Sequence, residues 1–370
     1  MPAEFDPTSL RNDVLARVQN KLAECELEAS FYFEAPDAWL SVWSQLAYCP
    51  VAAQRSMLAY QKAYLEGSGQ TVYDLSLILR SDGRPVGIWP LCLQQIGTDS
   101  KISSMGAAIS APLFASGLSP RTIKKLCTRA LSVLQQLARD LGQDVLITEQ
   151  PCWPSSEVPT ACSEWHQQLM SAGANIQTRH DLFADLSPDL PTIRATFRKS
   201  YRPLINVALR TWHADVMNAD NANSATWAEF KQLHKDVAGR STRADSTWAL
   251  QWGMILSRDA FLVALRDPSD QRLVGAGLFQ FTNDEGLYAV GAYDRALFDK
   301  PLGHAVQQRA IETLKSLGVR WYQVGERHYS QSLHAPSAKE VAISEFKQGF
   351  SSHLLCRHQF SLSNSPNGLV

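Results

Sequence analysis

The sequence has no long apolar run and no leader-like start. No stretch of its 370 residues approaches the roughly 18 apolar residues that a bilayer-spanning helix needs. The opening residues, Met-Pro-Ala-Glu-Phe-Asp-Pro, contain neither a basic segment nor an apolar one, so we expect no signal peptide. These absences predict a cytoplasmic protein without a membrane span.

Cysteine is sparse, and neither sign of charge is in excess. The seven cysteines are scattered, odd in number and never spaced as C-x-x-C, which argues against a disulfide framework or a zinc site. The 35 Lys and Arg residues against 36 Asp and Glu residues leave a net charge of −1, so no broad field for nucleic acid or membranes is expected. We therefore expect no metal and no DNA partner.

Several common catalytic signatures are also missing. The sequence contains no G-x-S-x-G, no H-E-x-x-H, no Walker loop and no G-x-G-x-x-G. Hydrolase, metalloprotease, NTPase and dinucleotide-binding functions therefore have no motif in their favour.

What the sequence does contain is one pattern that occurs twice. Residues 74–94 read DLSLILRSDGRPVGIWPLCLQ, and residues 259–281 read DAFLVALRDPSDQRLVGAGLFQF. Each is an apolar run that ends in Arg, then a turn rich in Asp, Gly or Pro, and then a second apolar run, which is typical of a β-hairpin. This register aligns Gly87 with Gly275.

The similarity continues downstream of both hairpins. An amphipathic segment follows in each copy, at residues 119–141 and 303–317, and an apolar strand comes next. Gly142 and Gly318 stand directly after these segments, where the end of a helix favours a residue with positive φ. Since 370 residues suit two domains, we predict one domain per copy, residues 1–180 and 181–370.

The order hairpin, strand, helix, strand resembles the core of the GNAT (Gcn5-related) acyltransferase superfamily. Tandem copies resemble more narrowly the Fem-type aminoacyltransferases and the acetyltransferase domains of polysaccharide-biosynthesis proteins. The matching segments, from about Ile193 to Phe350, are FRKSYRPLINVALR, FKQLHKDVAGRSTR, GLYAVGAYD, AIETLKSLGVRWYQVGE and EFKQGF. The resemblance implies an α/β fold with two tandem GNAT-like domains, each a mixed sheet flanked by helices. The first domain would be a scaffold and part of an acceptor groove, and the second would be catalytic.

The resemblance also implies roles for three residues. Fem-type enzymes carry a Phe-Lys-x-x-Phe motif, here Phe346, Lys347 and Phe350, whose lysine stabilises the oxyanion formed when a carbonyl is attacked. One fixed donor at such an oxyanion contributes on the order of 3 kcal/mol. An Arg after a helix and a Tyr in a strand bind the acceptor in the family, and these positions are Arg240 and Tyr288. The alternative for Lys347 is a surface lysine lying over two phenylalanine rings.

Other residues near these positions are suited to binding an anionic acceptor. Arg243 follows Arg240 in GRSTR and could bind phosphate or carboxylate in a bidentate manner. Arg202 adds positive charge in FRKSYR, and Trp248 could stack on a sugar or a base. Solvated basic turns and core packing are the alternatives for these residues.

A third group of residues resembles the segment of GNAT enzymes that binds the acyl donor. These enzymes hold the coenzyme A pyrophosphate at an R/Q-x-x-G-x-G/A loop that opens a helix. Here Lys300, Gly303 and Ala305 match that loop in degenerate form, and a Pro-Gly turn into a helix is the alternative. His304 in the same turn and Glu326 at a strand end are candidate general bases for the acceptor amine.

These observations predict an N-acyltransferase that uses acyl-CoA or another thioester as co-substrate and has no tightly bound cofactor. The acceptor would be the amine of an amino sugar or of a cell-envelope or polysaccharide precursor. The alternative donors are an aminoacyl-tRNA and an acyl-carrier protein. The rival class is a binding protein that kept the fold after losing the chemistry.

Overall fold

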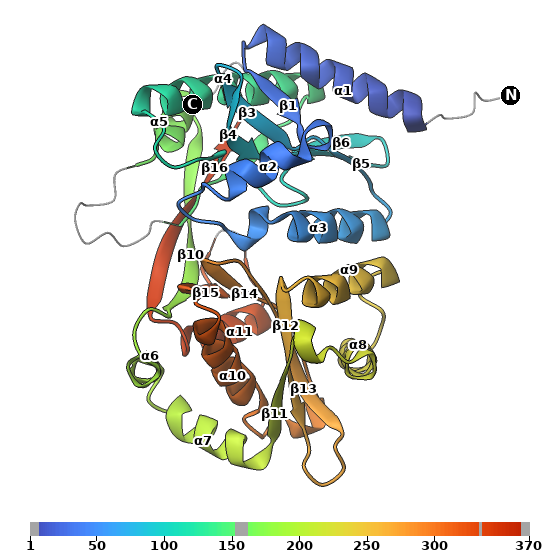
Figure 1. The fold of residues 1–370 in the computed structure, drawn as a ribbon, viewed down its shortest axis with the longest axis vertical. Coiled ribbons are helices and arrows are strands. Elements are labelled where there is room, and N and C mark those ends of the chain that lie inside the picture. Colours follow the sequence, from blue (N-terminus) through green and yellow to red (C-terminus); the bar gives the residue numbers. More distant parts are fainter. Residues whose placement is uncertain (1–6, 152–161, 333–334, 364–370) are drawn as a thin grey trace, which may run out of the picture. The chain divides into compact units, whose positions relative to one another are not determined.

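The computed structural model describes residues 7–151, 162–332 and 335–363, and it divides into two compact units (Figure 1). Both units are discontinuous in sequence. Unit 1 contains residues 1–47, 69–178 and 357–370, and unit 2 contains residues 48–68 and 179–356. One crossing, between residues 178 and 179, lies close to the boundary at 180/181 expected from the sequence. The sequence did not predict that residues 48–68 belong with the second half and residues 357–370 with the first.

Unit 1 is built from short sheets covered by helices. Its strands form the orders β1-β3-β4-β8, β2-β5-β6 and β16-β9-β7, in which only β7 and β9 run parallel. Its elements are α1 (Pro7–Glu24), β1 (Ala29–Phe31), α2 (Pro36–Trp43), β2 (Thr71–Asp74), β3 (Leu77–Ser81), β4 (Arg84–Trp89), β5 (Cys92–Ile96), β6 (Asp99–Ser103), β7 (Ile109–Ser110), β8 (Leu113–Phe114), α4 (Pro120–Leu141), β9 (Val145–Thr148) and α5 (Glu164–Ser171).

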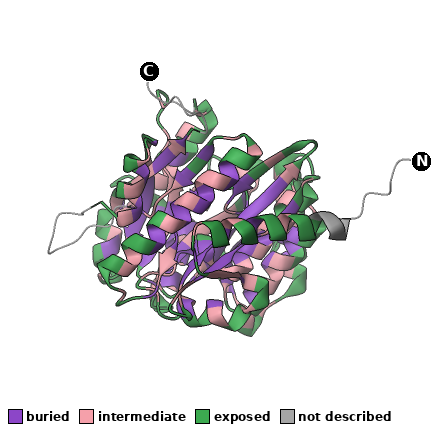
Figure 2. Cartoon of the chain, turned by 90° about the horizontal axis from the view of Figure 1, so that it is seen from above, coloured by how far each residue is buried: buried purple, intermediate pink, exposed green. Residues whose placement is uncertain are grey.

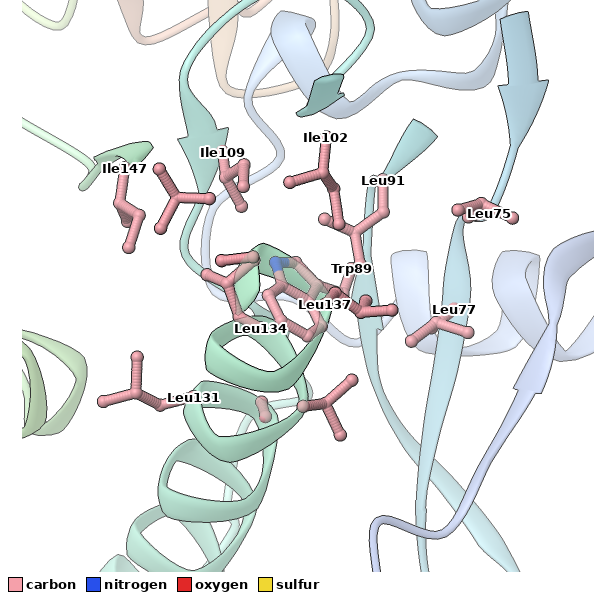
Figure 3. Close-up of a cluster of buried hydrophobic side chains, with 14 of the residues drawn as sticks. Leu75, Leu77, Trp89, Leu91, Ile102, Ile109, Leu131, Leu134, Leu137 and Ile147 are labelled. Atoms are coloured by element: carbon pink, nitrogen blue, oxygen red, sulfur yellow. The ribbon is translucent and has the colours of Figure 1, made fainter. Parts of the chain in front are cut away.

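The core of unit 1 forms where the apolar face of α4 meets the strands. Leu134 and Leu137 of this helix lie beside Trp89, and Leu131 and Leu77 belong to the same buried cluster (Figure 3). Ser119 caps the helix by accepting a hydrogen bond from the Thr122 N–H, and Gly142 ends it at φ +64°. The helix and its C-terminal glycine are therefore as the sequence predicted.

Unit 2 contains one larger sheet with the order β11-β12-β13-β14-β15-β10. The division between the units falls within β10 (Asn175–Asp185) and β16 (His353–Leu362). The other elements of unit 2 are α3 (Arg55–Gly67), α6 (Leu190–Thr196), α7 (Tyr201–Thr211), β11 (His213–Met217), α8 (Ser224–Ala238), α9 (Asp245–Leu256), β12 (Ala260–Arg266), β13 (Leu273–Phe281), β14 (Glu285–Tyr293), α10 (Leu302–Ser316), β15 (Trp321–Glu326) and α11 (Ala338–Gln348).

Both faces of the unit 2 sheet are covered. Alternate residues of β12 point to opposite faces. Phe261 and Val263 join a core with α7 and α10, whereas Leu262 and Ala264 join a second core with α3, α8 and α9. Burial on both faces explains why β12 reads as a continuous apolar run, and buried residues concentrate on the strands throughout (Figure 2).

The two hairpins share details beyond their sequence pattern. In each, the antiparallel register shifts at the same place, after Leu79 in β3 and after Leu265 in β12. A Cβ added at Gly87 would lie 2.8 Å from the Phe114 ring, and one at Gly275 would lie 2.8 Å from the Tyr293 ring. Both glycines therefore allow an aromatic side chain on the neighbouring strand of the sheet to approach. The copies differ in that strand, since β8 has two residues and β14 has nine.

Pro203 is accommodated within a helix. A proline inside a helical stretch usually kinks or ends the helix, but here the break lies earlier, between α6 and α7. Pro203 lies in the first turn of α7, where a backbone N–H has no partner within the helix and proline costs nothing. Within the residues that the structure describes, no helix is long and apolar enough to cross a membrane.

Residues 48–54 attach to unit 2 through a buried carboxylate. Glu285 at the start of β14 accepts hydrogen bonds from the Tyr48 hydroxyl and from the Val51 N–H, and Asp284 accepts one from the Cys49 N–H at 2.8 Å. Burial of the Glu285 side chain raises its pKa to about 7. This carboxylate holds the segment that leads into α3.

We expect the contribution of Glu285 to the stability of unit 2 to fall as the pH rises from about 4.5 to about 7, because folded Glu285 retains a proton that the unfolded chain releases near 4.5. The shift corresponds to on the order of 3 kcal/mol. Glu285→Gln should lose most of this slope. The measurement is the free energy of unfolding at pH 5 and pH 8, with the exposed Glu66→Gln as control. An equal slope in wild type and Glu285→Gln would contradict the assignment.

Candidate active site

The candidate site lies where two parallel strands of unit 2 stop pairing. β14 and β15 are paired from Glu285–Trp321 to Leu287–Gln323, and their pairing ends there although both strands continue. On its other edge, β14 stays paired with β13, with a bulge that leaves Ala289 without a partner between Tyr288 and Val290. The edge of β14 that faces β15 is thus open from Tyr288 onward.

Lys347, in the last turn of α11, extends into this opening. Its Nζ lies 5.3 Å from the centre of the Tyr288 ring on β14, and a Cβ added at Gly325 on β15 would lie 2.7 Å from the same atom. Among the described residues, no carboxylate forms an ion pair with this ammonium group. Burial lowers the pKa of Lys347 for lack of solvation. The site therefore holds a half-buried cation with no countercharge.

The two phenylalanines of the FKQGF segment fix the end of α11. The Phe350 side chain is fully buried and packs edge-on against Phe197, with ring centres 5.3 Å apart. Phe346 packs against Tyr201 and His304, and the Tyr201 hydroxyl donates to the Phe346 carbonyl at 3.2 Å. These contacts orient Lys347, so the phenylalanines hold the helix end rather than lie under an exposed lysine.

A cavity of about 350 Å³ lies beside the same stretch of β14. It is lined by α3, α9, β13 and β14 and is partly open to solvent, and Figure 1 shows α3 beside α9. Tyr288 lines this cavity and also contacts Lys347. The lining residues are Met57, Tyr60, Gln61, Tyr64, Arg243, Gln251, Gln280, Leu287, Tyr288, Ala289 and Val290.

Arg243 is the charged group of the cavity, and its position is fixed by four contacts. Its guanidinium donates to the Tyr60 hydroxyl and to Gln251 Oε1, both at 3.0 Å, and Nη2 lies 3.3 Å from His234 Nε2. The Trp248 ring lies 4.6 Å from its central carbon. Burial, and secondarily the charge of Arg243, lowers the pKa of His234, so this imidazole accepts the hydrogen bond as a neutral group. Arg243 Nε is buried and has no partner among the described residues.

Two buried glutamines add unsatisfied polar atoms to the cavity wall. Gln251 and Gln280 are at most 1% exposed. Because Gln251 Oε1 accepts from Arg243, its Nε2 is a donor, and it has no partner among the described residues; neither does Gln280 Oε1. A buried donor and a buried acceptor left unpaired cost free energy unless something fills the space between them. The cavity is therefore suited to a polar ligand.

Glu326 lies at the end of β15, one residue after Gly325. Its carboxylate forms an ion pair with Arg179 at 3.2 Å, and His328 Nδ1 lies 3.8 Å away. Glu326 is thus near the site, but its role as general base stays a prediction.

His304 is poorly suited to act as the general base. It packs among Tyr201, Phe346 and Phe350, and burial lowers its pKa to about 4. Its Nε2 is buried without a partner among the described residues. An imidazole with this pKa is neutral at pH 7 but a weak base, which disfavours the role inferred from the sequence.

We expect His304→Phe to leave the pH dependence of acyl transfer between pH 5 and 8 unchanged. The folded imidazole does not titrate in this range, and the unfolded one gains a proton below about 6.5. On acidification towards pH 4, wild type should therefore lose stability relative to His304→Phe. Rate profiles and melting temperatures of both proteins test this. If the rate of the wild type fell near pH 6 and that of His304→Phe did not, His304 would be the general base after all.

The loop matched to coenzyme A binding does not form an open cradle. A Cβ added at Gly303 would lie 2.9 Å from the Phe346 ring, so the glycine serves packing against α11. Ala305 is fully buried in the core, and Lys300 is exposed and paired with Asp299 at 3.0 Å. These side-chain contacts give the cofactor role no support, and it stays a prediction.

The remaining predicted residues lie away from the cavity or behind its wall. Arg240 is exposed in the turn after α8. Trp248 is 5% exposed and packs against Trp227 and Phe230, so it supports Arg243 rather than offering a free face. Arg202 donates to the Ala195 carbonyl at 2.6 Å. Of the five predicted acceptor residues, Arg243 and Tyr288 therefore line the cavity.

Sequence reasoning missed the contribution of α3. Met57, Tyr60, Gln61 and Tyr64 recur at i, i+3, i+4 and i+7, which puts them on one helix face. That spacing marks a buried face but does not reveal which part of the chain covers it. Gln251 and Gln280 carried no signal beyond being polar residues in apolar segments.

Comparison with known proteins gives matches in structure alone. No protein-family model matches the sequence, and no curated protein matches it. FemX is similar with a TM-score of 0.57 and 12% identity, covering 82% of this chain and 90% of that one. The C-terminal domain (DUF2156) of a candidate lysylphosphatidylglycerol synthetase from Agrobacterium fabrum has a TM-score of 0.56 and 11% identity, with coverage of 88% and 90%. L-PGS from Bacillus licheniformis has a TM-score of 0.53 and 11% identity, with coverage of 95% and 93%.

At these identities the similarities establish the fold. They extend over more than four fifths of this chain and nine tenths of each of the others. The α/β fold with mixed sheets flanked by helices is confirmed. In fold, the chain is similar to FemX and to the two synthetase structures.

Proposed function

We propose that this chain is an acyltransferase whose unit 2 moves an activated acyl group onto an amine. The observation that carries the proposal is the unpaired, half-buried Lys347 ammonium at the opening between β14 and β15. A buried cation without a countercharge is costly, and its retention is explained if a negative charge appears beside it during the reaction.

The reaction assigns one task to Lys347. The acceptor nitrogen attacks the acyl carbonyl carbon, the carbonyl π electrons move to oxygen, and the tetrahedral oxyanion lies beside the ammonium. Collapse of this intermediate expels the thiolate or alkoxide of the donor, and the nitrogen loses a proton. A low-dielectric setting strengthens the interaction between ammonium and oxyanion relative to water.

The cavity beside Tyr288 supplies the acceptor site in this proposal. Arg243 offers a fixed positive charge with a free Nε, Gln251 offers a donor and Gln280 an acceptor. An amine-bearing molecule that also carries an anionic group and an amide or hydroxyl groups satisfies all three. An amino sugar or a cell-envelope precursor has this chemistry, and a thioester such as acyl-CoA is our first candidate donor.

A second candidate is transfer from an aminoacyl ester. It is favoured by the similarity in fold to FemX and L-PGS, and by the name lysylphosphatidylglycerol synthetase, which implies a lysyl group on a lipid in that protein. The packing of Gly303 against Phe346 also removes local support for a coenzyme A pyrophosphate. The chemistry at Lys347 is the same for either donor.

The deciding experiment compares donors on the purified full chain. Acetyl-CoA and aminoacyl-tRNA are each incubated with amino sugars and amino-sugar phosphates, and acylated product is detected by mass spectrometry. A donor present at about 100 times its dissociation constant should also stabilise the fold by roughly 2.7 kcal/mol, visible as a thermal shift. Product from one donor identifies it. A chain that is stabilised by an acceptor but acylates none with either donor would instead be a binding protein that kept the fold.

A further inference from the structure

Three residues of unit 1, none of them part of the candidate active site, bring their ligand atoms together. Glu149 directly follows β9, His166 lies in α5 and His358 lies in β16. One carboxylate oxygen and one nitrogen from each imidazole all lie within 4.8 Å of one another. Within the described part of the chain, this is the one group of three such side chains with that geometry.

One carboxylate oxygen lies close to both imidazoles. Glu149 Oε2 lies 2.7 Å from His166 Nδ1 and 3.6 Å from His358 Nδ1. The two imidazole rings meet edge to face, with centres 5.1 Å apart. The carboxylate and the His166 side chain are nearly buried, with 10% and 12% exposed, and His358 is 24% exposed, which leaves one side open to solvent.

Backbone and side-chain contacts of the chain hold the three groups in place. The Glu149 N–H donates to the His358 carbonyl at 3.1 Å, at the end of the β9–β16 ladder. Ser163 caps α5 by accepting from the His166 N–H, and its hydroxyl donates to the other oxygen of Glu149. Phe360 packs edge-on against His166 with ring centres 5.0 Å apart. The carboxylate and one imidazole are thus oriented by their neighbours, as ligands of a metal usually are.

We propose that Glu149, His166 and His358 bind a divalent transition-metal ion, with Zn²⁺ the best fit. Two imidazole nitrogens and one carboxylate oxygen are ligands that zinc takes at about 2.0–2.2 Å. Tetrahedral ligands at such distances lie about 3.3 Å apart, so the His166–Glu149 contact must open by roughly half an ångström while the His358–Glu149 contact closes slightly. Water would supply the fourth ligand.

Binding would exchange a proton for the metal. An imidazole nitrogen that faces the carboxylate must carry no hydrogen to become a ligand, so zinc uptake should release protons. The Arg357 guanidinium bonds to Thr148 Oγ1 at 3.0 Å, next to the group, and its charge opposes a cation. We therefore expect an affinity in the micromolar range rather than that of a thiolate site.

The spacing of the residues explains why the sequence predicted no metal. Positions 149, 166 and 358 form no short motif, because His358 comes 209 residues after Glu149 in the sequence. The expectation of no metal rested on cysteine spacing, which does not address a site of histidine and glutamate.

The test uses the full-length chain stripped of metal with a chelator. Zn²⁺ is titrated in competition with a chromogenic chelator, and Co²⁺ is added separately as a spectroscopic probe of geometry. We expect one ion per chain, a visible absorption band of tetrahedral or five-coordinate cobalt, and a higher melting temperature with zinc. A wild-type chain that binds no zinc and shows no such band would overturn the proposal.

Variants distinguish this site from other ligands of the chain. His166→Gln and His358→Gln should each abolish the cobalt band, while His213→Gln, which removes an exposed histidine 3.3 Å from Asp215, should keep it. Cys162→Ser and Cys356→Ser, at the two cysteines that are exposed among the described residues, should keep it as well. If the cobalt band were lost in the cysteine variants, or retained in both His166→Gln and His358→Gln, the metal would be bound elsewhere in the chain. If a cluster variant fails to fold, the other variant and the wild-type spectrum decide.

Discussion

Replacing Lys347 with methionine is expected to slow acyl transfer by about 10²–10³-fold, the loss measured when one oxyanion donor is removed from other acyltransfer sites. Methionine has nearly the length of lysine and no charge, so it can fill the space between Tyr288 and Gly325. Removing an ammonium group that burial leaves poorly solvated should also leave the melting temperature equal or higher. Activity and stability are thus expected to change in opposite directions.

The measurement is kcat and KM for the donor and acceptor identified by the incubation experiment, together with thermal unfolding. If the ammonium stabilises the oxyanion, the loss falls on kcat, with KM nearly unchanged. Lys339→Met is the matched control, because Lys339 lies in the same helix but is exposed. A kcat for Lys347→Met within a few-fold of wild type would exclude the oxyanion role and leave the lysine as a packing residue.

Much of the fold could be predicted because its signals are local. Hairpin turns rich in Asp and Gly, amphipathic segments and glycines after helices each act within a few residues. Gly318, which lies after α10 at φ +80°, is where the sequence placed it. The duplication could be predicted for the same reason, since both copies repeat these local signals in the same order.

The composition of the units could not be predicted, because it depends on contacts between distant parts of the chain. Residues 48–68 join unit 2 because Glu285, more than 200 positions later, accepts from Tyr48 and Val51. Tyr60 reaches the cavity through the same attachment. A buried carboxylate in β14 looks like any other acidic residue in the sequence, so neither the attachment nor the cavity wall had a local signal.

The same difference between local signals and distant contacts explains which site residues could be predicted. Tyr288 and Lys347 were found through a resemblance that covers local motifs, and the structure brings them together. Arg240 was singled out by the same resemblance, yet it points to solvent while Arg243 lines the cavity. The choice between two arginines three residues apart is decided by their partners, Tyr60 and Gln251, which no motif includes.

Arg243→Lys is accordingly the second large effect we expect. Lysine keeps the charge, but its single ammonium cannot replace a planar group that donates to Tyr60 and Gln251 while lying on Trp248. Lost hydrogen bonds to a charged group cost about 1.5–3 kcal/mol each, so unit 2 should be destabilised by about 2–4 kcal/mol. Denaturant unfolding monitored by circular dichroism measures this loss.

The same substitution should weaken acceptor binding far more than it slows the chemical step. The guanidinium does not touch Lys347, so its loss should raise the acceptor KM by on the order of 10–100-fold while kcat falls little. Arg240→Lys is the matched control, three residues away and exposed, and should change stability by less than about 0.5 kcal/mol. If Arg240→Lys instead raised the KM and Arg243→Lys did not, the acceptor would bind at the position that the family resemblance indicates, outside the cavity. Equal kinetics in both variants would mean that neither arginine contacts the acceptor, and the cavity beside Tyr288 would then hold a different part of the substrate.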